Sequence, residues 1–389
     1  MNAPLPIVAI DFFCGAGGMT NGLIRAGIHV LAGIDNQPLC ETTYSQNTNN
    51  DGSHPTYLCK NIFPKTRTCP NGQQSEIAEE IRSLIKAFKK KRGVRKVKLV
   101  FAICAPCQPF TKITKIEMSE SRQYKRSNDK NLLLTTTDLI SEFLPDAIIC
   151  ENVEGIAQSD KNSVLGKFKR SLNCRGYTFN AKTVNALKFG VPQNRRRTIG
   201  IGYHKKRYNV IANIPEADES FDGYVSVAKI IGHLPAIAAG EIHPEVPNHR
   251  ARTLSPLNLK RISCAPPGSD NSYMKSTPYG DLSLDCHKRL TKKWGETSFS
   301  DTYTRMCADN AAPTITTKFI SISNGRFGHY DIQQNRALTP HEAALLQTFD
   351  DDYVFYPEDN LTFTATLIGN AVPPKLAKFF GSKIIEVIR

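Results

Sequence analysis

The stretch Ile7–Gly18, IVAIDFFCGAGG, decides the fold. Its apolar first half is typical of a buried strand, and the glycines that follow open a helix. Glycines at such a turn let the backbone approach a ligand, and the free N–H groups of a helix start attract an anionic group. Asp35 ends the next apolar run, 20 residues after Gly15, where a carboxylate can bind ribose hydroxyls. A dinucleotide-binding fingerprint would have its third glycine at position 20, where this sequence has Thr20. This departure weakens the prediction of a dinucleotide, and an adenosine-type ligand remains an alternative.

Strands and helices alternate through the first 200 residues. Strands are predicted at Ile7–Phe13, Val30–Ile34, Leu99–Cys104, Ala147–Cys150 and Thr198–Gly202, and helices at Glu76–Phe88 and Asn131–Phe143. This alternation predicts an α/β fold with a mostly parallel sheet covered on both faces, and ligands at the carboxyl ends of the strands.

After about residue 205 the alternation stops. Pro, Gly, His and Ser punctuate a basic stretch that runs to about residue 335, and helical periodicity returns at Pro340–Phe349 and Pro374–Ile388. We interpret the stretch as a second, loop-rich basic domain; the alternative is a long irregular insertion without a function of its own.

The composition narrows the class of protein. The 389 residues include 50 Lys and Arg against 36 Asp and Glu, a net charge of +14, which favours a polyanionic partner, nucleic acid before membrane. No apolar run approaches the about 18 residues of a spanning helix. Met1–Pro4 lacks the basic region and cleavage site of a signal peptide, so a secreted protein is not expected. Eleven scattered cysteines are typical of reduced thiols. We therefore expect a cytoplasmic protein without a membrane partner and without a metal site.

Two further motifs follow predicted strands. Cys107, in Pro106-Cys107-Gln108, is placed for nucleophilic work, although a metal or redox pair with Cys104 and a plain buried thiol are alternatives. Glu151, in Glu151-Asn152-Val153, is placed for acid or base work, or caps a helix.

A fourth motif, Gln193–Arg197, precedes the last predicted strand. Alternate residues of a strand face the same way, so Arg195 and Arg197 are expected to point together. Such a pair suits a carboxylate, a phosphate or a base edge, and equally a structural ion pair.

These four motifs in this order resemble those of the cytosine-C5 DNA methyltransferases of prokaryotic restriction-modification systems. Pro313–Thr316, Arg336–Ala343 and Gly369–Pro373 extend the resemblance downstream. It implies a Rossmann-like methyltransferase fold with a mixed, mostly parallel sheet, plus a smaller loop-rich target recognition domain. The implied division is a catalytic and cofactor-binding domain at 1–220, a target recognition domain at 221–335, a hinge at 336–364, and a C-terminal helix at 365–389 that returns to the catalytic domain.

The resemblance implies methyl transfer from S-adenosylmethionine to carbon 5 of a flipped cytosine in a specific duplex DNA sequence. Cys107 would form a covalent bond to C6, helped as a thiolate by Arg195. Glu151 would bond N3 and the exocyclic amine, and Arg197 would bind O2.

The resemblance also assigns binding residues. Those for the cofactor are Phe13, Gly15, Gly17, Gly18, Asp35, Asn36, Asn61, Ile62, Pro106, Asn370 and Ala371. Those for DNA are Gln108, Thr111, Lys112, Lys130, Arg250, Arg252 and Thr316. The polar stretch Gln108–Lys130 is expected to be a mobile loop that closes over DNA.

The implied partners are double-stranded DNA and a cognate restriction endonuclease that acts separately, with the enzyme itself a monomer. An RNA cytosine methyltransferase is the nearest alternative, since Cys107–Thr111 also suits the transfer-RNA branch of the family; the basic segment 220–310 favours DNA. A nicotinamide oxidoreductase is disfavoured by Thr20. A catalytically inactive DNA-binding protein is the third alternative, but it gives no reason for four residues to occur together: Cys107, Glu151, Arg195 and Arg197.

Overall fold

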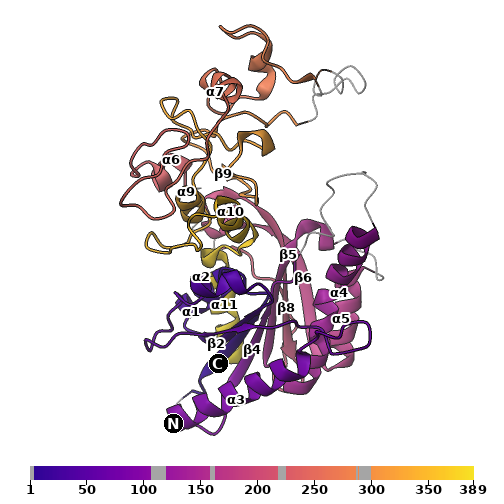
Figure 1. Ribbon diagram of the computed structural model, residues 1–389. Helices are drawn as coiled ribbons and strands as arrows, with labels where there is room; N and C mark the ends of the chain where they lie inside the picture. Colours follow the sequence, from indigo (N-terminus) through magenta and orange to yellow (C-terminus); the bar gives the residue numbers. More distant parts are fainter. Residues whose placement is uncertain (1–3, 107–119, 158–162, 218–224, 286–287, 289–298) are drawn as a thin grey trace. The chain divides into compact units, whose positions relative to one another are not determined.

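The computed structural model describes residues 4–106, 120–157, 163–217, 225–285, 288 and 299–389, with the backbone alone at 120–131 (Figure 1). The chain forms two compact units. The first unit holds residues 1–185, 196–218 and 372–389, and the second holds 186–195 and 219–371.

The first unit is built on a seven-stranded sheet in the order β3-β2-β1-β4-β5-β8-β6. Its strands are β1 (Ile7–Phe12), β2 (His29–Asp35), β3 (Thr56–Cys59), β4 (Lys98–Ile103), β5 (Ala147–Val153), β6 (Tyr177–Asn185) and β8 (Arg196–His204). Only β8 runs against its neighbours, pairing antiparallel with β5 and β6. The expected α/β fold with a mixed, mostly parallel sheet is confirmed.

Helices cover this sheet. They are α1 (Gly18–Arg25), α2 (Glu41–Tyr44), α3 (Gln74–Arg92), α4 (Glu120–Phe143), α5 (Val164–Cys174) and α11 (Pro374–Ile388), with 3₁₀ turns η1 (Pro38–Cys40) and η3 (Glu154–Ala157). Apolar side chains of α3, α4 and α5 share one buried cluster with alternate residues of the central strands, such as Val8, Ile10 and Phe12 of β1. The helices α1 and α11 pack closely, since a Cβ on Gly22 would lie 2.4 Å from the Ala377 Cβ. Central strands buried on both faces explain the continuous apolar runs.

The helix α4 corrects one expectation. Residues 108–130 were expected to form a polar loop, but Glu120 begins a helix that continues to Phe143. The apolar periodicity is confined to the second half of α4, so the pattern from Asn131 onward marks only part of the helix. Residues 107–119 lie outside the described part of the chain.

The second unit has little regular structure. It contains the two-stranded pair β7 (Gln193–Asn194) and β9 (Ala312–Pro313), the helices α6 (Val227–Ile231), α7 (Pro256–Ser263), α9 (Pro340–Leu346) and α10 (Leu361–Asn370), and the 3₁₀ turns η4 (Ala186–Phe189), η5 (Asn271–Lys275) and η6 (Ile322–Asn324). This unit extends to residue 371, so residues 336–371 group with it and only 372–389 group with the first unit. The bounds expected for the hinge and the returning helix differ accordingly. The functions of these domains stay predictions.

Buried arginines organise the interior of the second unit. Arg305, fully buried, donates to the backbone carbonyls of Ile262, His329, Asp331 and Gln334. Irregular backbone leaves carbonyls that no helix or sheet satisfies, and a guanidinium supplies five N–H donors. Some of the basic residues of the chain therefore lie inside this unit and bind its backbone.

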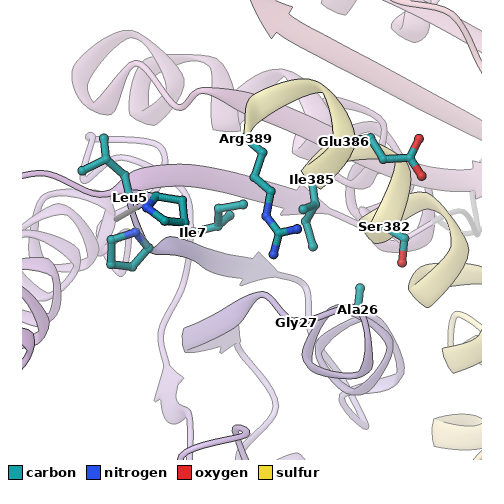
Figure 2. Close-up of a pocket in the computed structure, with 10 residues that line it drawn as sticks. Leu5, Ile7, Ala26, Gly27, Ser382, Ile385, Glu386 and Arg389 are labelled. Carbon is teal, nitrogen blue, oxygen red and sulfur yellow. The ribbon is translucent and has the colours of Figure 1, made fainter. Parts of the chain in front are cut away.

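A pocket opens at the amino-terminal edge of the sheet in the first unit (Figure 2). Its volume is about 440 Å³, and it is lined by Pro4, Leu5, Pro6, Ile7, Ala26, Gly27, Ser382, Ile385, Glu386 and Arg389. Ile7 begins β1 and Gly27 precedes β2, so this pocket lies away from the carboxyl ends of the strands. Within the described part of the chain, every helix is too short or too polar to cross a bilayer.

Candidate active site

Four motif segments meet at the carboxyl-terminal edge of the sheet. In the strand registers, Phe12 of β1 lies beside Ile34 of β2 and Ile103 of β4, and Ile103 lies beside Cys150 of β5. The glycine turn, Asp35, the segment before Cys107 and Glu151 each follow one of these residues within a few positions. The fold therefore gathers these segments at one edge, where ligands of open α/β sheets bind.

The glycine turn is tied directly to Asp35. The Asp35 Oδ2 accepts a 3.0 Å hydrogen bond from the Gly15 N–H, and Oδ1 accepts a 3.1 Å bond from the Gln37 N–H. Phe13, Gly15 and Gly17 have φ angles of 62°, 48° and 81°, so the chain turns through the left-handed region three times. Burial raises the pKa of Asp35, and the two N–H donors oppose that rise.

Gly15 faces open space, because a Cβ added there would meet no atom within 4 Å. Gly17 is closely packed instead, since its added Cβ would lie 2.3 Å from Asn47 Nδ2. The turn thus presents bare backbone on one side, with a half-buried carboxylate and the half-buried ring of Phe13 nearby in sequence. Such a cradle accepts a ligand with a polar hydroxylated part.

The other residues expected at the cofactor differ in their surroundings. Asn36 and Pro106 are exposed, while the side chain of Ile62 belongs to the hydrophobic core. The Asn61 Oδ1 accepts a 3.2 Å bond from the Phe63 N–H, which fixes the turn after β3. Any contact of Ile62 with a ligand would therefore use its backbone.

Glu151 and Arg197 form a sequestered ion pair. Val153 of β5 lies opposite Arg197 of β8, which places Arg197 diagonally from Glu151 on the same face of the sheet. The Arg197 Nε lies 3.0 Å from Glu151 Oε1, and the side chains are 14% and 9% exposed. Low exposure strengthens the pair relative to one in water. Among the described residues Glu151 Oε1 has no hydrogen-bond partner, so the contact with Arg197 at the end of β5 is electrostatic.

Arg196 and Glu154 form a second pair that contrasts with the first. The Arg196 Nη2 lies 2.7 Å from Glu154 Oε1, and the side chains are 60% and 51% exposed. The same residue types, with the arginine on β8 and the glutamate in η3 after β5, thus form a solvated surface pair.

Asn152 connects the Glu151 segment to the segment that leads to Cys107. Its Nδ2 donates a 2.9 Å hydrogen bond to the carbonyl oxygen of Ala105, two residues before Cys107. The sequence signal for this contact is that Asn152 lies near the end of β5 and Ala105 just past the end of its neighbour β4. Cys107 itself lies outside the described residues. Burial raises the pKa of the Cys104 thiol well above its usual value, as expected of a structural cysteine.

The expectation that Arg195 and Arg197 point together is wrong. The strand is interrupted between β7 and β8, and Arg195 falls in the gap, so alternation along one strand does not apply. Arg195 is 1% exposed and donates to the carbonyl oxygens of Ile315, Gly369 and Ala371 at 2.9–3.2 Å. All four residues belong to the second unit. The guanidinium holds three backbone segments together. Because Cys107 lies outside the described residues, the role of Arg195 beside a thiolate stays a prediction.

The Gln193 side chain takes part in the same arrangement, and its role was not anticipated. Its Oε1 accepts from the Ile315 N–H at 2.9 Å, and its Nε2 donates to Gln347 Oε1 at 3.0 Å. The two ends of the Gln193–Arg197 motif are therefore used differently: Gln193 and Arg195 order the second unit, and Arg197 pairs with Glu151.

The residues expected at DNA are only partly described. Gln108, Thr111 and Lys112 lie outside the described residues, and Lys130 is described only as backbone of α4. In the second unit, Arg252 and Thr316 are exposed, and Arg250 donates to the carbonyl oxygen of Asp359 at 3.3 Å. Asn370 is exposed at the end of α10, and Ala371 is the C-cap of that helix.

Comparisons with known proteins agree with this geometry. The family model described as C-5 cytosine-specific DNA methylase matches residues 7–386. The chain belongs to this family, whose enzymes methylate carbon 5 of cytosine in DNA.

Two curated relatives match over most of their length. The chain is 35% identical over 378 residues to the Type II methylase M.HgiDII of Herpetosiphon aurantiacus, covering 96% of this chain and 94% of the relative. It is 27% identical to the Type II methyltransferase M1.HphI of Haemophilus parahaemolyticus, covering 98% and 88%. Among solved structures, a putative DNA modification methyltransferase encoded within an E. coli prophage has the same fold, with a TM-score of 0.63, 20% identity, and coverage of 98% of this chain and 99% of that one.

Proposed function

We propose that this methylase transfers a methyl group from S-adenosylmethionine to a flipped cytosine in a specific duplex DNA sequence, through a covalent bond between Cys107 and cytosine C6. The observation that carries the proposal is the Glu151–Arg197 pair, sequestered at the end of β5 and joined through Asn152 to the segment that leads to Cys107. A carboxylate and a guanidinium thereby lie at the edge of the sheet where the described segment before Cys107 ends.

The residues present fit S-adenosylmethionine. The open side of Gly15 allows backbone to approach the ligand, and the half-buried Asp35 carboxylate suits ribose hydroxyls. Phe13 would pack on the adenine. When bound, the cofactor supplies an electrophilic methyl group.

Carbon 5 of cytosine needs activation because it belongs to an intact aromatic ring. The Cys107 thiolate would add to C6 and turn the ring into an enamine that is nucleophilic at C5. C5 would then take the methyl group of bound S-adenosylmethionine, with cleavage of its S–CH3 bond and S-adenosylhomocysteine as the leaving group. Glu151 bonds N3 and the exocyclic amine and stabilises the charge that develops on the ring. Arg197, already paired with Glu151, orients that carboxylate and contacts O2. Loss of the C5 proton to a base then expels the thiolate.

A stacked cytosine cannot present C6 to a cysteine, so the base must leave the helix, at a cost of roughly a few kcal/mol. The excess positive charge of the chain, +14 overall, favours the phosphate contacts that compensate this cost. Two relatives bear the names Type II methylase and Type II methyltransferase, which supports a specific target sequence and a restriction-modification context with a separate endonuclease. We infer a monomer acting on DNA in the cytoplasm.

Glu151→Gln and Glu154→Gln form a matched pair of variants that tests the role of Glu151. Each removes one carboxylate that pairs with an arginine of β8, one sequestered and one solvated. We expect Glu151→Gln to lower the single-turnover methylation rate by about 10²–10⁴-fold, the usual contribution of a positioned acid or base, and Glu154→Gln to leave it within about twofold.

The assay uses tritiated S-adenosylmethionine, with duplex DNA and transfer RNA as separate acceptors. Bisulfite sequencing of DNA from cells expressing the chain identifies the target cytosine for the duplex. Equal rates for the two variants would contradict the role of Glu151, and methylation of transfer RNA alone would contradict the proposed substrate.

A further inference from the structure

A buried polar chain lies directly behind the glycine turn. The Asp11 Oδ2, on β1, accepts hydrogen bonds from the Thr20 backbone N–H at 3.1 Å and from the Thr20 hydroxyl at 2.7 Å. The Thr20 Oγ1 lies 3.0 Å from the Tyr44 hydroxyl. Because the single Thr20 hydroxyl proton is donated to Asp11, the Tyr44 hydroxyl donates to Thr20. All three residues are 0% exposed.

Tyr44 also packs between two segments of the candidate cofactor site. A Cβ added to Gly33, on β2, would lie 2.3 Å from the Tyr44 Cζ. A Cβ added to Gly17 would lie 3.1 Å from the Tyr44 Cδ2. The ring thus contacts the glycine turn on one side and, on the other, the strand that ends at Asp35.

We propose that Thr20 and Tyr44 are positioning residues that hold the Gly15–Gly18 turn in register with Asp35 and thereby set the affinity for S-adenosylmethionine. The inference rests on the proposed function, since it assumes that this cofactor binds at the turn. Neither residue is expected to touch the cofactor.

Two observations explain why the turn depends on these hydroxyls. The Gly15 N–H donates to Asp35, so a displaced turn also displaces the ribose-binding carboxylate. Among the described residues, Asp11 Oδ1 has no hydrogen-bond partner, so Oδ2 carries the hydrogen bonding of this buried carboxyl. Removing the Thr20 hydroxyl leaves Asp11 with one donor, the Thr20 backbone N–H. A buried carboxyl with too few hydrogen bonds raises the free energy of the folded state, and the turn lowers that free energy if it moves.

Thr20→Val and Thr20→Ser test the inference. Valine keeps the size of threonine without its hydroxyl, whereas serine keeps the hydroxyl. Thr136→Val is the matched control, because Thr136 is also 0% exposed and its hydroxyl donates at 2.7 Å, but only to the Leu133 carbonyl of its own helix. Tyr44→Phe removes the other hydroxyl and carries the test alone if Thr20→Val does not fold.

The measurements are the Kd for S-adenosylmethionine by titration calorimetry, and KM and kcat for methylation. We expect Thr20→Val to raise Kd and KM about tenfold, the effect of one lost hydrogen bond to a carboxyl, with kcat at saturating cofactor within about twofold. Tyr44→Phe should shift Kd in the same direction, whereas Thr20→Ser and Thr136→Val should match the wild type. A purely structural role would lower the active fraction, and so the apparent kcat, at unchanged Kd.

Unchanged Kd in both Thr20→Val and Tyr44→Phe, with the wild type binding cofactor, would overturn this inference alone. A Thr136→Val variant with the same loss of affinity as Thr20→Val would also overturn it. Wild-type protein that bound no S-adenosylmethionine would overturn the proposed function and this inference with it.

Discussion

Replacing Asp11 with asparagine should remove a pH dependence of stability that the structure predicts for the wild type. Burial raises the pKa of Asp11 from 3.8 to about 7, while the two hydrogen bonds from Thr20 oppose that rise. Between these two values the native state keeps a proton that the unfolded chain has released, so the free energy of unfolding falls as pH rises. The slope is about 1.4 kcal/mol per pH unit, and the full effect is about 4 kcal/mol.

The assay is chemical denaturation of the wild type and Asp11→Asn between pH 5 and pH 8, compared as a difference so that other titrating groups cancel. The wild type should lose stability relative to the variant up to about pH 7, and the difference should then level off. Asp270→Asn is the control. The Ser272 hydroxyl holds the pKa of the exposed Asp270 below its usual value of 3.8, and so below the range tested, and the charged groups that act on Asp270 are Arg326 and Lys275, so this difference should stay constant. A flat difference for Asp11→Asn would contradict the raised pKa of Asp11.

Two other variants test contacts in each unit. Arg336 donates to both carboxylate oxygens of Glu342 at 2.7–2.8 Å inside the second unit. Burial opposes the charge on Glu342, but the Arg336 guanidinium holds the pKa of Glu342 near 2. Arg336→Gln should therefore cost about 3–5 kcal/mol of unfolding free energy, measured by thermal and denaturant unfolding, and a loss below about 1 kcal/mol would contradict the pairing. Asn152→Ala removes the bond to the Ala105 carbonyl and should lower kcat about tenfold at unchanged Kd for cofactor; an unchanged single-turnover rate would contradict a role in placing Cys107.

The central strands of the sheet could be predicted because they are buried on both faces. The apolar runs at Ile7–Phe13 and Leu99–Cys104 match β1 and β4 to within a residue. The strands β3 and β6 were not predicted, and these are the two edges of the sheet. Edge strands have one neighbour and mix polar with apolar residues, so a search for continuous apolar runs does not find them.

In the candidate site, the residues that could be predicted are those that lie at or just after the end of a strand. Asp35, Glu151 and the glycine turn lie at the expected edge because parallel strands bring their carboxyl ends together. The backbone contacts of Arg195 were not predicted because β7 and β8 were taken for one strand, and residue type alone cannot tell a guanidinium that binds backbone carbonyls from one that binds a ligand. The same ambiguity affects the basic composition of the second unit, where Arg305 and Arg336 are internal.

The contacts of Tyr44 and Asn152 could not be predicted because they depend on which segments the fold brings together. Thr20 was noted only as a departure from a glycine pattern. In the structure its hydroxyl joins Asp11 to Tyr44, 24 residues away from Thr20 in sequence.

The most direct test of the account is covalent trapping on DNA that carries 5-fluorocytosine at the target position. Fluorine cannot leave C5 as a proton does, so the thiolate cannot be expelled after methyl transfer. The account predicts a complex of protein and DNA that resists denaturation, requires S-adenosylmethionine, maps to the peptide containing Cys107 and is lost in Cys107→Ala. A complex that persisted in Cys107→Ala, or methylation by an enzyme that formed no such complex, would contradict it.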